Sequence, residues 1–388
     1  MKVMVANTLY APHRVGGAEI SVQILCESLV ALGHQVRALT FHAEPYRKCS
    51  IINGVEVVYL PLKNIYWPFD NKKRSSLQRG LWHIIDSYNL ASYLQFCNEL
   101  DMYRPDLVHT NNLAGFSVAV WGAAKKRGVK ILHTARDYYL FHPNSTLFKQ
   151  GSNQDPRSYG VWIWSLFRRF HSKKVNTFVG ISDFIKEFHL ANGFFPRALK
   201  RRIYNAVAID PVSDDTECTE PLRIGFIGKL SAAKGFDIFC QFAQAIKAEN
   251  ENVMAIAAGD YADEEKRHLA ALASAAQVNV LGRLDLPAFL AKVDIVILPT
   301  KWREPFGRTV IECALANKVV LVSSVGGITE MLDIAPTISE LTGTPTYEKL
   351  LAMKKESRAV SPSVREVFSP ETITQEYIAE YDRVKNGY

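Results

Sequence analysis

Two glutamates, Glu304 and Glu312, have seven residues between them and frame a turn that leads into a helix-like segment. The turn is Pro305-Phe306-Gly307, and the apolar segment before it ends at Leu298. Carboxylates accept hydrogen bonds from hydroxyl groups, and backbone N–H groups at a helix start attract anions. This segment could therefore bind an extended ligand that has hydroxyl groups and an anionic centre.

Two glycine-containing turns follow strand-like segments, one in each half of the chain. The first contains Gly16 and Gly17, and the second is the Gly228–Gly235 segment with Lys229 and Lys234. A strand, turn and helix in this order point backbone N–H groups at whatever lies above the strand, which suits a phosphate group. A structural role is the alternative for both turns. Neither matches GxGxxG, which counts against a nicotinamide-dependent dehydrogenase.

Strand-like runs alternate with helical patterns, which is typical of α/β proteins with parallel sheets. The first set of predicted strands is Lys2–Ala6, Val36–Thr40, Val55–Leu60, Leu107–His109, Lys130–His133 and Thr177–Gly180, with helices at Ala18–Leu32, Ile84–Leu100, Phe116–Lys126 and Asp183–Ala191. The second set is Arg223–Ile227, Val253–Ala257, Asn279–Leu281, Ile295–Leu298 and Val319–Val322.

The repeated pattern and the length of 388 residues predict two domains. We place the N-terminal domain at 1–205, completed by a C-terminal helix at 369–388, and the C-terminal domain at 206–368. The segment from Asn205 to Pro221 contains a second proline, Pro211, and the acidic residues Asp214, Asp215 and Glu217, which suits a linker.

The composition is that of a folded globular protein, with 48% hydrophobic and 22% charged residues. The first apolar run is too short for a signal peptide, and polar residues interrupt the most apolar later stretch, so we expect a cytoplasmic protein. Its six cysteines are scattered without a CxxC pattern, and we expect neither a metal site nor disulfides.

Positive charge is concentrated in the first half. Residues 1–202 contain 27 Lys+Arg against 13 Asp+Glu, whereas the remainder contains 19 against 26. Three basic and aromatic clusters occur there: Trp67, Phe69, Lys72, Lys73, Arg74, Arg79 and Trp82; Trp162, Trp164, Phe167, Arg168, Arg169, Phe170, Lys173 and Lys174; and Phe194, Phe195, Arg197, Lys200, Arg201 and Arg202. They are typical of binding to an anionic membrane surface, which suggests a lipid-linked acceptor. Aromatic residues in the core with a solvated basic rim are the alternative, and no motif indicates nucleic acid.

The glutamates and their turn resemble the E-x7-E motif of the family 4 retaining glycosyltransferases, which have the GT-B fold. This resemblance implies two Rossmann-like parallel-sheet domains that face a central cleft. It extends over nearly the whole chain, at Gly16-Gly17-Ala18-Glu19, Asp137-Tyr138, Ile181-Ser182, Tyr204-Asn205, Gly228–Gly235 and Val325-Gly326-Gly327-Ile328 before Glu330.

The resemblance assigns donor binding to the C-terminal domain. It implies that Glu304 binds hydroxyls of the donor sugar and that Glu312 binds the ribose of the nucleotide. The backbone at Phe306 and Gly307 would contact sugar or phosphate.

Lys229 and Lys234 would neutralise the diphosphate, although the family more often has arginine at the first position and lysine lacks its bidentate geometry. Gly16 and Gly17 are expected to approach the donor, and Arg283 to lie near the base or simply at the surface. Because no Asp-x-Asp follows a strand, we expect no essential metal, and no cofactor besides the nucleotide diphosphate sugar as co-substrate.

In the N-terminal domain, which we expect to bind the acceptor, the chain departs from the family. Many relatives have histidine before Asp137, where this sequence has Arg136. Arginine cannot act as a base near neutral pH, but it could stabilise a leaving diphosphate or bind an anionic acceptor. His133 is a candidate for the missing histidine, with a place in the core as the alternative.

We therefore predict a retaining glycosyltransferase that moves a sugar from a nucleotide diphosphate to a glycan or glycolipid acceptor at the inner face of the cell membrane. Its alternatives are transfer to a soluble small acceptor and a catalytically silent nucleotide-sugar-binding subunit that supports a partner enzyme.

Overall fold

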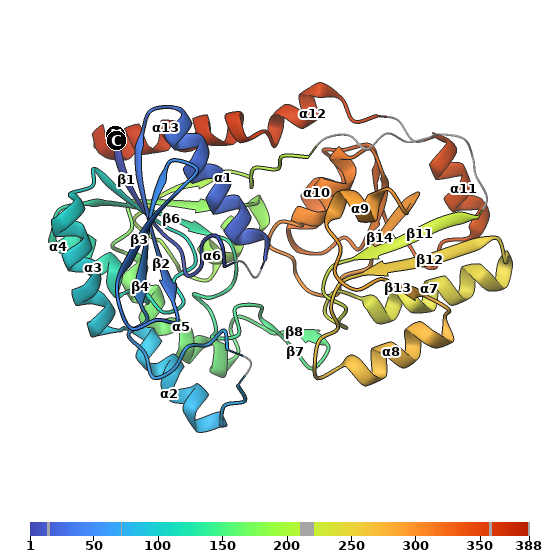
Figure 1. Cartoon of the computed structure of the whole chain (residues 1–388), viewed down its shortest axis with the longest axis horizontal. Coiled ribbons are helices and arrows are strands. Elements are labelled where there is room, and N and C mark those ends of the chain that lie inside the picture. Colours follow the sequence, from blue (N-terminus) through green and yellow to red (C-terminus); the bar gives the residue numbers. More distant parts are fainter. Residues whose placement is uncertain (14–15, 71, 210–220, 357–358, 387–388) are drawn as a thin grey trace. The chain divides into compact units, whose positions relative to one another are not determined.

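The computed structural model describes residues 1–388 except 14–15, 71, 210–220, 357–358 and 387–388 (Figure 1). The chain forms two compact units. Unit 1 comprises Met1–Leu147, Gln154–Ala206 and Pro370–Tyr388, and unit 2 comprises Phe148–Asn153 and Val207–Ser369. Arg14 and most of the expected linker lie outside the described residues.

The sheet of unit 1 has eight strands in the order β10-β9-β6-β5-β1-β2-β4-β3. All neighbours are parallel except β3, which pairs antiparallel with β4 at the edge. The strands are β1 (Lys2–Ala6), β2 (Gln35–His42), β3 (Lys48–Ile52), β4 (Val55–Pro61), β5 (Leu107–Thr110), β6 (Lys130–Ala135), β9 (Thr177–Gly180) and β10 (Leu199–Arg202).

Local signals set the helix boundaries of unit 1. Asn89 caps one helix by accepting from the N–H of Ser92 at 3.0 Å, and Ser182 caps another by accepting from Ile185 at 3.0 Å. The helices are α1 (Gly17–Ala31), α2 (Ser76–Ser87), α3 (Leu90–Tyr103), α4 (Ala119–Lys126), α5 (Tyr159–Ser172), α6 (Asp183–Ala191) and α13 (Pro370–Asn386).

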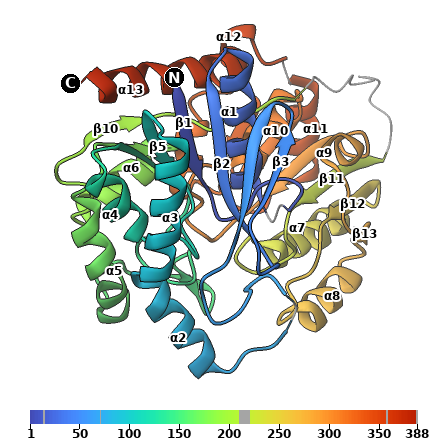
Figure 2. The ribbon, with the colours of Figure 1, turned by 60° about the vertical axis from the view of Figure 1, so that its left-hand side comes forward.

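The last helix, α13, completes the core of unit 1. It packs against α1 and β6. Figure 2 shows α13 beside α1. Tyr377 and Tyr381 are fully buried, and the Tyr381 hydroxyl lies 2.7 Å from Nδ1 of His109. A chain end that buries two tyrosines belongs to the core of this unit rather than to a loose tail.

Unit 2 has a six-stranded parallel sheet in the order β13-β12-β11-β14-β15-β16, the order of a doubly wound nucleotide-binding fold. Its strands are β11 (Leu222–Ile227), β12 (Val253–Ala258), β13 (Asn279–Val280), β14 (Ile295–Leu298), β15 (Val319–Val322) and β16 (Ile338–Glu340). The helices are α7 (Phe236–Glu249), α8 (Lys266–Ala275), α9 (Leu286–Leu290), α10 (Arg308–Leu315), the 3-10 helix η1 (Gly326–Met331), α11 (Tyr347–Glu356) and α12 (Pro362–Val367). Figure 1 shows α7 and α8 on one face of this sheet and α10 on the other.

A short hairpin of unit 2 comes from the middle of the sequence of unit 1. Strands β7 (Phe148–Lys149) and β8 (Ser152–Asn153) pair antiparallel. The chain leaves unit 1 after Leu147 and re-enters it at Gln154. Sequence patterns predicted neither the hairpin nor its assignment to unit 2.

Other elements also differ from those expected. The single helix predicted at Ile84–Leu100 is two helices, because Tyr88 is extended and the side chain of Asn89 caps the second. Sequence reasoning also missed β3, β10, β16 and the whole of α5.

The proposed basic and aromatic clusters are partly core. Trp82, Phe194 and Phe195 are buried, and Arg168 has no exposed surface. Arg168 points inward because α5 is amphipathic: its guanidinium lies 4.2 Å from the ring centre of Tyr139, and its closest approach to the Asp86 carboxylate is 3.9 Å. These four residues therefore cannot contact a membrane, which corrects the expectation for them.

Candidate active site

A cavity of unit 2 lies where β11 and β14 adjoin at the centre of the sheet. In doubly wound sheets, ligands bind at the carboxyl ends of the strands at such a switch point. The cavity wall includes Gly228 after β11, Leu298 at the end of β14 and Gly307 before α10. Lys234 and Glu304 supply a cation and a carboxylate to the same wall.

The loop after β14 is fixed onto the glycine turn after β11. The N–H of Lys301 and the hydroxyl of Thr300 donate to the carbonyl oxygen of Ala233 at 3.0 and 3.1 Å. A Cβ at Gly235 would lie 1.8 Å from the carbonyl oxygen of Pro299, so no larger residue fits without moving the backbone. The two loops therefore support each other.

Glu304 is held through both its side chain and its backbone. The ammonium of Lys234 contacts the Glu304 carboxylate and lies 4.7 Å from the ring centre of Trp302. The N–H of Gly327 donates to the Glu304 carbonyl oxygen at 2.7 Å, and a Cβ at Gly326 would stand 2.4 Å from that oxygen. An adjacent cation and carboxylate can bind a ligand that offers both an anionic group and hydroxyls.

Asn153 in β8 holds the same loop, and sequence reasoning missed it. Its side-chain amide donates to the carbonyl oxygen of Lys301 at 2.8 Å and accepts from the N–H of Arg303 at 3.0 Å. The contact joins residues 150 positions apart. No local pattern signals it.

Glu312 lies one helical turn beyond Arg308 in α10, and the Arg308 guanidinium donates to it at 2.8 Å. Burial raises the pKa of the Glu312 carboxyl, and the positive charge of Arg308 opposes this rise. The ring of Phe306 is buried and packs 6.1 Å from that of Phe368. A ligand contact at Phe306 would therefore come from its backbone.

Four predicted donor residues of unit 2 do not line the cavity: Glu312, Phe306, Lys229 and Arg283. Lys229 is exposed and does not line the cavity, which leaves Lys234 as the lysine of the expected pair that does. The side chain of Arg283 is 82% exposed and pairs with Asp260 at 2.9 Å, as the surface alternative expected.

In unit 1, the Gly16-Gly17 turn is linked to Asp137 through the charge of Glu19. The N–H of Gly16 donates to Glu19 at 2.8 Å as α1 begins, and Asn112 donates to Asp137 at 3.0 Å. Burial raises the pKa of Asp137 to about 6; the N–H of Tyr139 lowers it, and the Glu19 carboxylate adds to the rise. Asp137 can therefore titrate near neutral pH.

Arg136 follows β6 and is buried. Its guanidinium donates to the amide oxygen of Asn111 at 2.9 Å and to that of Asn205. Both amides are uncharged, and they fix the orientation of the guanidinium. The geometry suits the predicted role toward an anionic group.

His133 lies in the core. Its Nδ1 is 2.9 Å from the Thr110 hydroxyl, and its ring stacks on Phe195 with centroids 5.5 Å apart. Burial lowers the pKa of His133 to about 3. It is therefore neutral and enclosed, and the structure supports the core alternative over a replacement for the missing histidine.

Within the described parts of the chain, no group of three His, Cys, Asp or Glu side chains is arranged to hold a metal ion. Among the helices of the same parts, none is long and apolar enough to cross a membrane.

Comparisons with known proteins agree with this architecture. The profile of Glycosyltransferase Family 4 matches residues 15–210, and that of Glycosyl transferases group 1 matches residues 221–342. The chain is 42% identical over 381 residues to an "uncharacterized 42.6 kDa protein in cps region" of Klebsiella pneumoniae, with 98% of this chain and 100% of the relative covered. It is 23% identical to an uncharacterized glycosyltransferase of Methanocaldococcus jannaschii, over 90% of this chain and 86% of the relative.

Solved structures share the fold at low sequence identity. HepE from Anabaena, in complex with UDP, has a TM-score of 0.68 and 16% identity over 98% of this chain and 100% of its own. The trehalose-6-phosphate synthase OtsA has a TM-score of 0.68 and 11% identity over 99% of both chains. Together with the profile matches, these findings show that the chain belongs to glycosyltransferase family 4 and has the GT-B fold, with two Rossmann-like units.

Proposed function

We propose that this glycosyltransferase is a retaining enzyme that takes its sugar from a nucleotide diphosphate held in the unit 2 cavity. The observation that carries the proposal is the contact between Lys234 and Glu304 at the carboxyl ends of β11 and β14. The Anabaena relative in complex with UDP and glucose supports a nucleotide-sugar donor.

In this proposal each group of unit 2 has one task. Lys234, with the N–H groups at the start of α10, neutralises the diphosphate, while Glu304 accepts hydrogen bonds from sugar hydroxyls. Glu312 accepts from the ribose. Lys229 is exposed, so we assign it at most a contribution to long-range attraction.

The reaction breaks the bond between the anomeric carbon and a diphosphate oxygen. The new bond joins that carbon to an acceptor hydroxyl oxygen on the same face of the sugar, and the hydroxyl proton passes to the departing diphosphate. This route needs neither a protein base nor a metal ion. We therefore expect activity to persist in the presence of a metal chelator.

Unit 1 is proposed to bind the acceptor near Asp137. Arg136 would stabilise the leaving group or an anionic acceptor through its oriented positive charge. His133 is not part of the proposed site because it is enclosed by the core.

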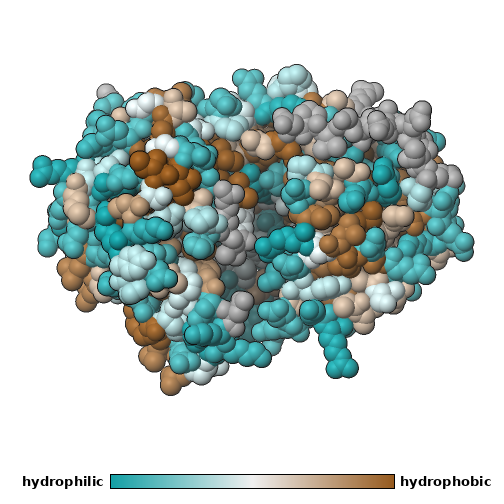
Figure 3. Space-filling view, viewed as in Figure 1, coloured by the Kyte–Doolittle hydropathy of each residue, from teal (hydrophilic) through white to brown (hydrophobic). Residues whose placement is uncertain are grey.

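The acceptor is proposed to be a lipid-linked glycan at the inner face of the cell membrane. Exposed apolar side chains support this on α2, at Leu77 and Ile84, and on α5, at Trp162 and Phe170. Figure 3 shows apolar side chains at the lower left, where α2 lies in Figure 1. The cps region named for the Klebsiella relative supports a role in polysaccharide assembly.

A thermal-shift screen with UDP, GDP and ADP tests the donor assignment. A nucleotide at about 100 times its dissociation constant stabilises the native state by about 2.7 kcal/mol. We expect one nucleotide to raise the melting temperature of the wild type and of Glu348→Gln, a variant of an exposed residue in α11, but not of Glu312→Gln. If no nucleotide stabilises the wild type, or if Glu312→Gln responds fully, the donor site is misassigned.

Transfer assays separate the enzyme from its alternatives. The purified chain with the nucleotide sugar should release the nucleoside diphosphate when supplied with a lipid-linked glycan, and NMR of the product should show retained configuration. Turnover only with a soluble acceptor would favour the small-acceptor enzyme. Donor binding without any turnover would favour the silent subunit.

A further inference from the structure

A second cavity of about 740 Å³ lies in unit 1, at the opposite edge of the sheet from Arg136 and Asp137. It is framed by the ends of α4 and α5 and by the starts of β6, β9 and β10, so it lies at the amino ends of these parallel strands. The proposed chemistry occurs at the carboxyl ends.

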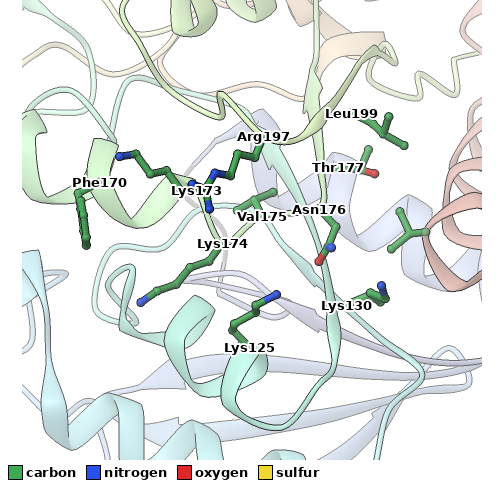
Figure 4. A pocket seen from close by; sticks show the side chains of 11 residues that line it. Lys125, Lys130, Phe170, Lys173, Lys174, Val175, Asn176, Thr177, Arg197 and Leu199 are labelled. Carbon is green, nitrogen blue, oxygen red and sulfur yellow. The ribbon is translucent and has the colours of Figure 1, made fainter. Parts of the chain in front are cut away.

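Five basic side chains line the cavity, and among the residues that the structure describes no acidic side chain does. Figure 4 labels the five basic side chains among the lining residues: Lys125, Lys130, Lys173, Lys174 and Arg197. The ammonium of Lys174 also lies 2.6 Å from Nδ1 of His171. Among the described residues, none of the five forms an ion pair with a carboxylate. A concave wall of like charges is unfavourable by itself, and a bound anion relieves the repulsion.

The helix dipoles explain only part of this charge. Lys125 is in the last turn of α4 and Lys173 caps α5, where cations stabilise the negative ends of the helices. Lys130 begins a strand and Arg197 lies in the loop before β10, so neither stabilises a helix end.

A second observation also indicates a ligand. Thr177 lines the same cavity, and its hydroxyl is fully buried and has no hydrogen-bond partner among the described residues. An unsatisfied buried hydroxyl costs about 1–3 kcal/mol. An oxygen atom of a bound anion could accept its hydrogen bond.

We propose that this cavity binds a phosphate group. Phosphate offers several acceptor oxygens and the negative charge that five basic side chains require. Phe170 lines the same cavity and is 60% exposed, and Phe167 is exposed on the same helix. A phosphate attached to an apolar chain, as in the headgroup of an anionic lipid, would pair with the basic side chains and contact these aromatic rings. A lipid as the source of the phosphate rests on the proposed membrane association, whereas a soluble phosphate does not.

The test uses the full chain with two double variants that remove equal charge. Lys130→Gln/Arg197→Gln alters the cavity, and Lys48→Gln/Arg104→Gln alters one exposed lysine and one exposed arginine elsewhere in unit 1. Calorimetry with inorganic pyrophosphate, carried out with unit 2 saturated by its nucleoside diphosphate, reports the unit 1 cavity. Flotation with vesicles rich in phosphatidylglycerol or made only of phosphatidylcholine reports lipid. Each basic residue near an anionic surface raises the affinity for that surface roughly fivefold, so the loss of two should weaken vesicle binding roughly thirtyfold.

We expect pyrophosphate binding that is lost in the cavity variant and kept in the control variant. Binding to phosphatidylglycerol vesicles with the same pattern identifies lipid as the source, and pyrophosphate binding without vesicle binding identifies a soluble phosphate. Equal losses in both variants, or no binding of either probe, would overturn the proposal. Nucleotide affinity of the same variants reports unit 2, so a failed donor assignment is distinguishable from a failed phosphate site.

Discussion

Two lysines beside the unit 2 cavity provide a matched comparison. Lys234 and Lys301 each have a side chain that is 31% exposed, and each pairs with a carboxylate that is 18% or 19% exposed. The partner of Lys234 is Glu304 in the cavity wall, whereas that of Lys301 is Asp237, outside it. Replacing either lysine by methionine removes one charge and one ion pair and keeps most of the aliphatic stem.

The two variants should lose similar stability and different function. Partly exposed ion pairs contribute about 0.2–1 kcal/mol each, so we expect comparable small drops in the free energy of unfolding for Lys234→Met and Lys301→Met. A hydrogen bond to a charged group contributes about 1.5–3 kcal/mol, so losing the diphosphate contact should weaken nucleotide binding roughly ten- to a hundredfold in Lys234→Met alone.

Isothermal titration of both variants with the nucleoside diphosphate that binds the wild type measures this difference, and urea denaturation measures the stability. Unchanged affinity in Lys234→Met would refute the role of this lysine in the cavity. Equal losses in both variants would mean that the loops are disturbed, not that a specific contact is missing.

Three further predictions concern the supports of the two units. Gly326→Ala should weaken donor binding although it removes no polar group, because the new Cβ would press on the backbone of Glu304. Isothermal titration should show a lower nucleotide affinity for this variant. The control Gly343→Ala, at another positive-φ glycine with open space around it, should keep the wild-type affinity. Asn153→Ala removes two hydrogen bonds to the loop after β14 and should lower stability by about 1–3 kcal/mol, which denaturation can measure; an unchanged midpoint would contradict the contact. Burial raises the pKa of Asp86 to about 7. Between about pH 4 and 7 the native state therefore holds a proton that the unfolded state has released. The free energy of unfolding should fall by up to about 4 kcal/mol as the pH rises through this range. Asp86→Asn should remove that slope in pH-dependent denaturation, and an identical slope in the variant would assign it to other groups.

The elements were predictable where side-chain pattern determines local structure. The buried strands β9, β14 and β15 coincide with the predicted ranges because their residues are nearly all apolar. The helix α5 was missed because its inward face contains a charged residue, Arg168, which pattern reasoning places outside. Burial of an arginine depends on partners from other elements, here Tyr139 and Asp86, that sequence spacing does not reveal.

The candidate site was predictable to a similar degree. Sequence reasoning proposed Lys234 and Glu304 for one site, and the structure brings them into contact. It left Arg283 either near the base or at the surface, because a position after a strand does not determine where a long side chain points, and the structure places it at the surface. The role of Asn153 could not be predicted from the sequence because its contacts depend on tertiary folding alone.

The division of the chain limits how this enzyme can be taken apart or recombined. The polypeptide passes between the two units four times, after Leu147, Asn153, Ala206 and Ser369. A fragment made of Val207–Ser369 would lack the amide of Asn153 that fixes its own loop. Exchange of donor specificity with a relative would therefore have to transfer the Phe148–Asn153 hairpin together with the Val207–Ser369 segment. A simple fusion near residue 206 would combine the loop after β14 of one protein with the hairpin of the other.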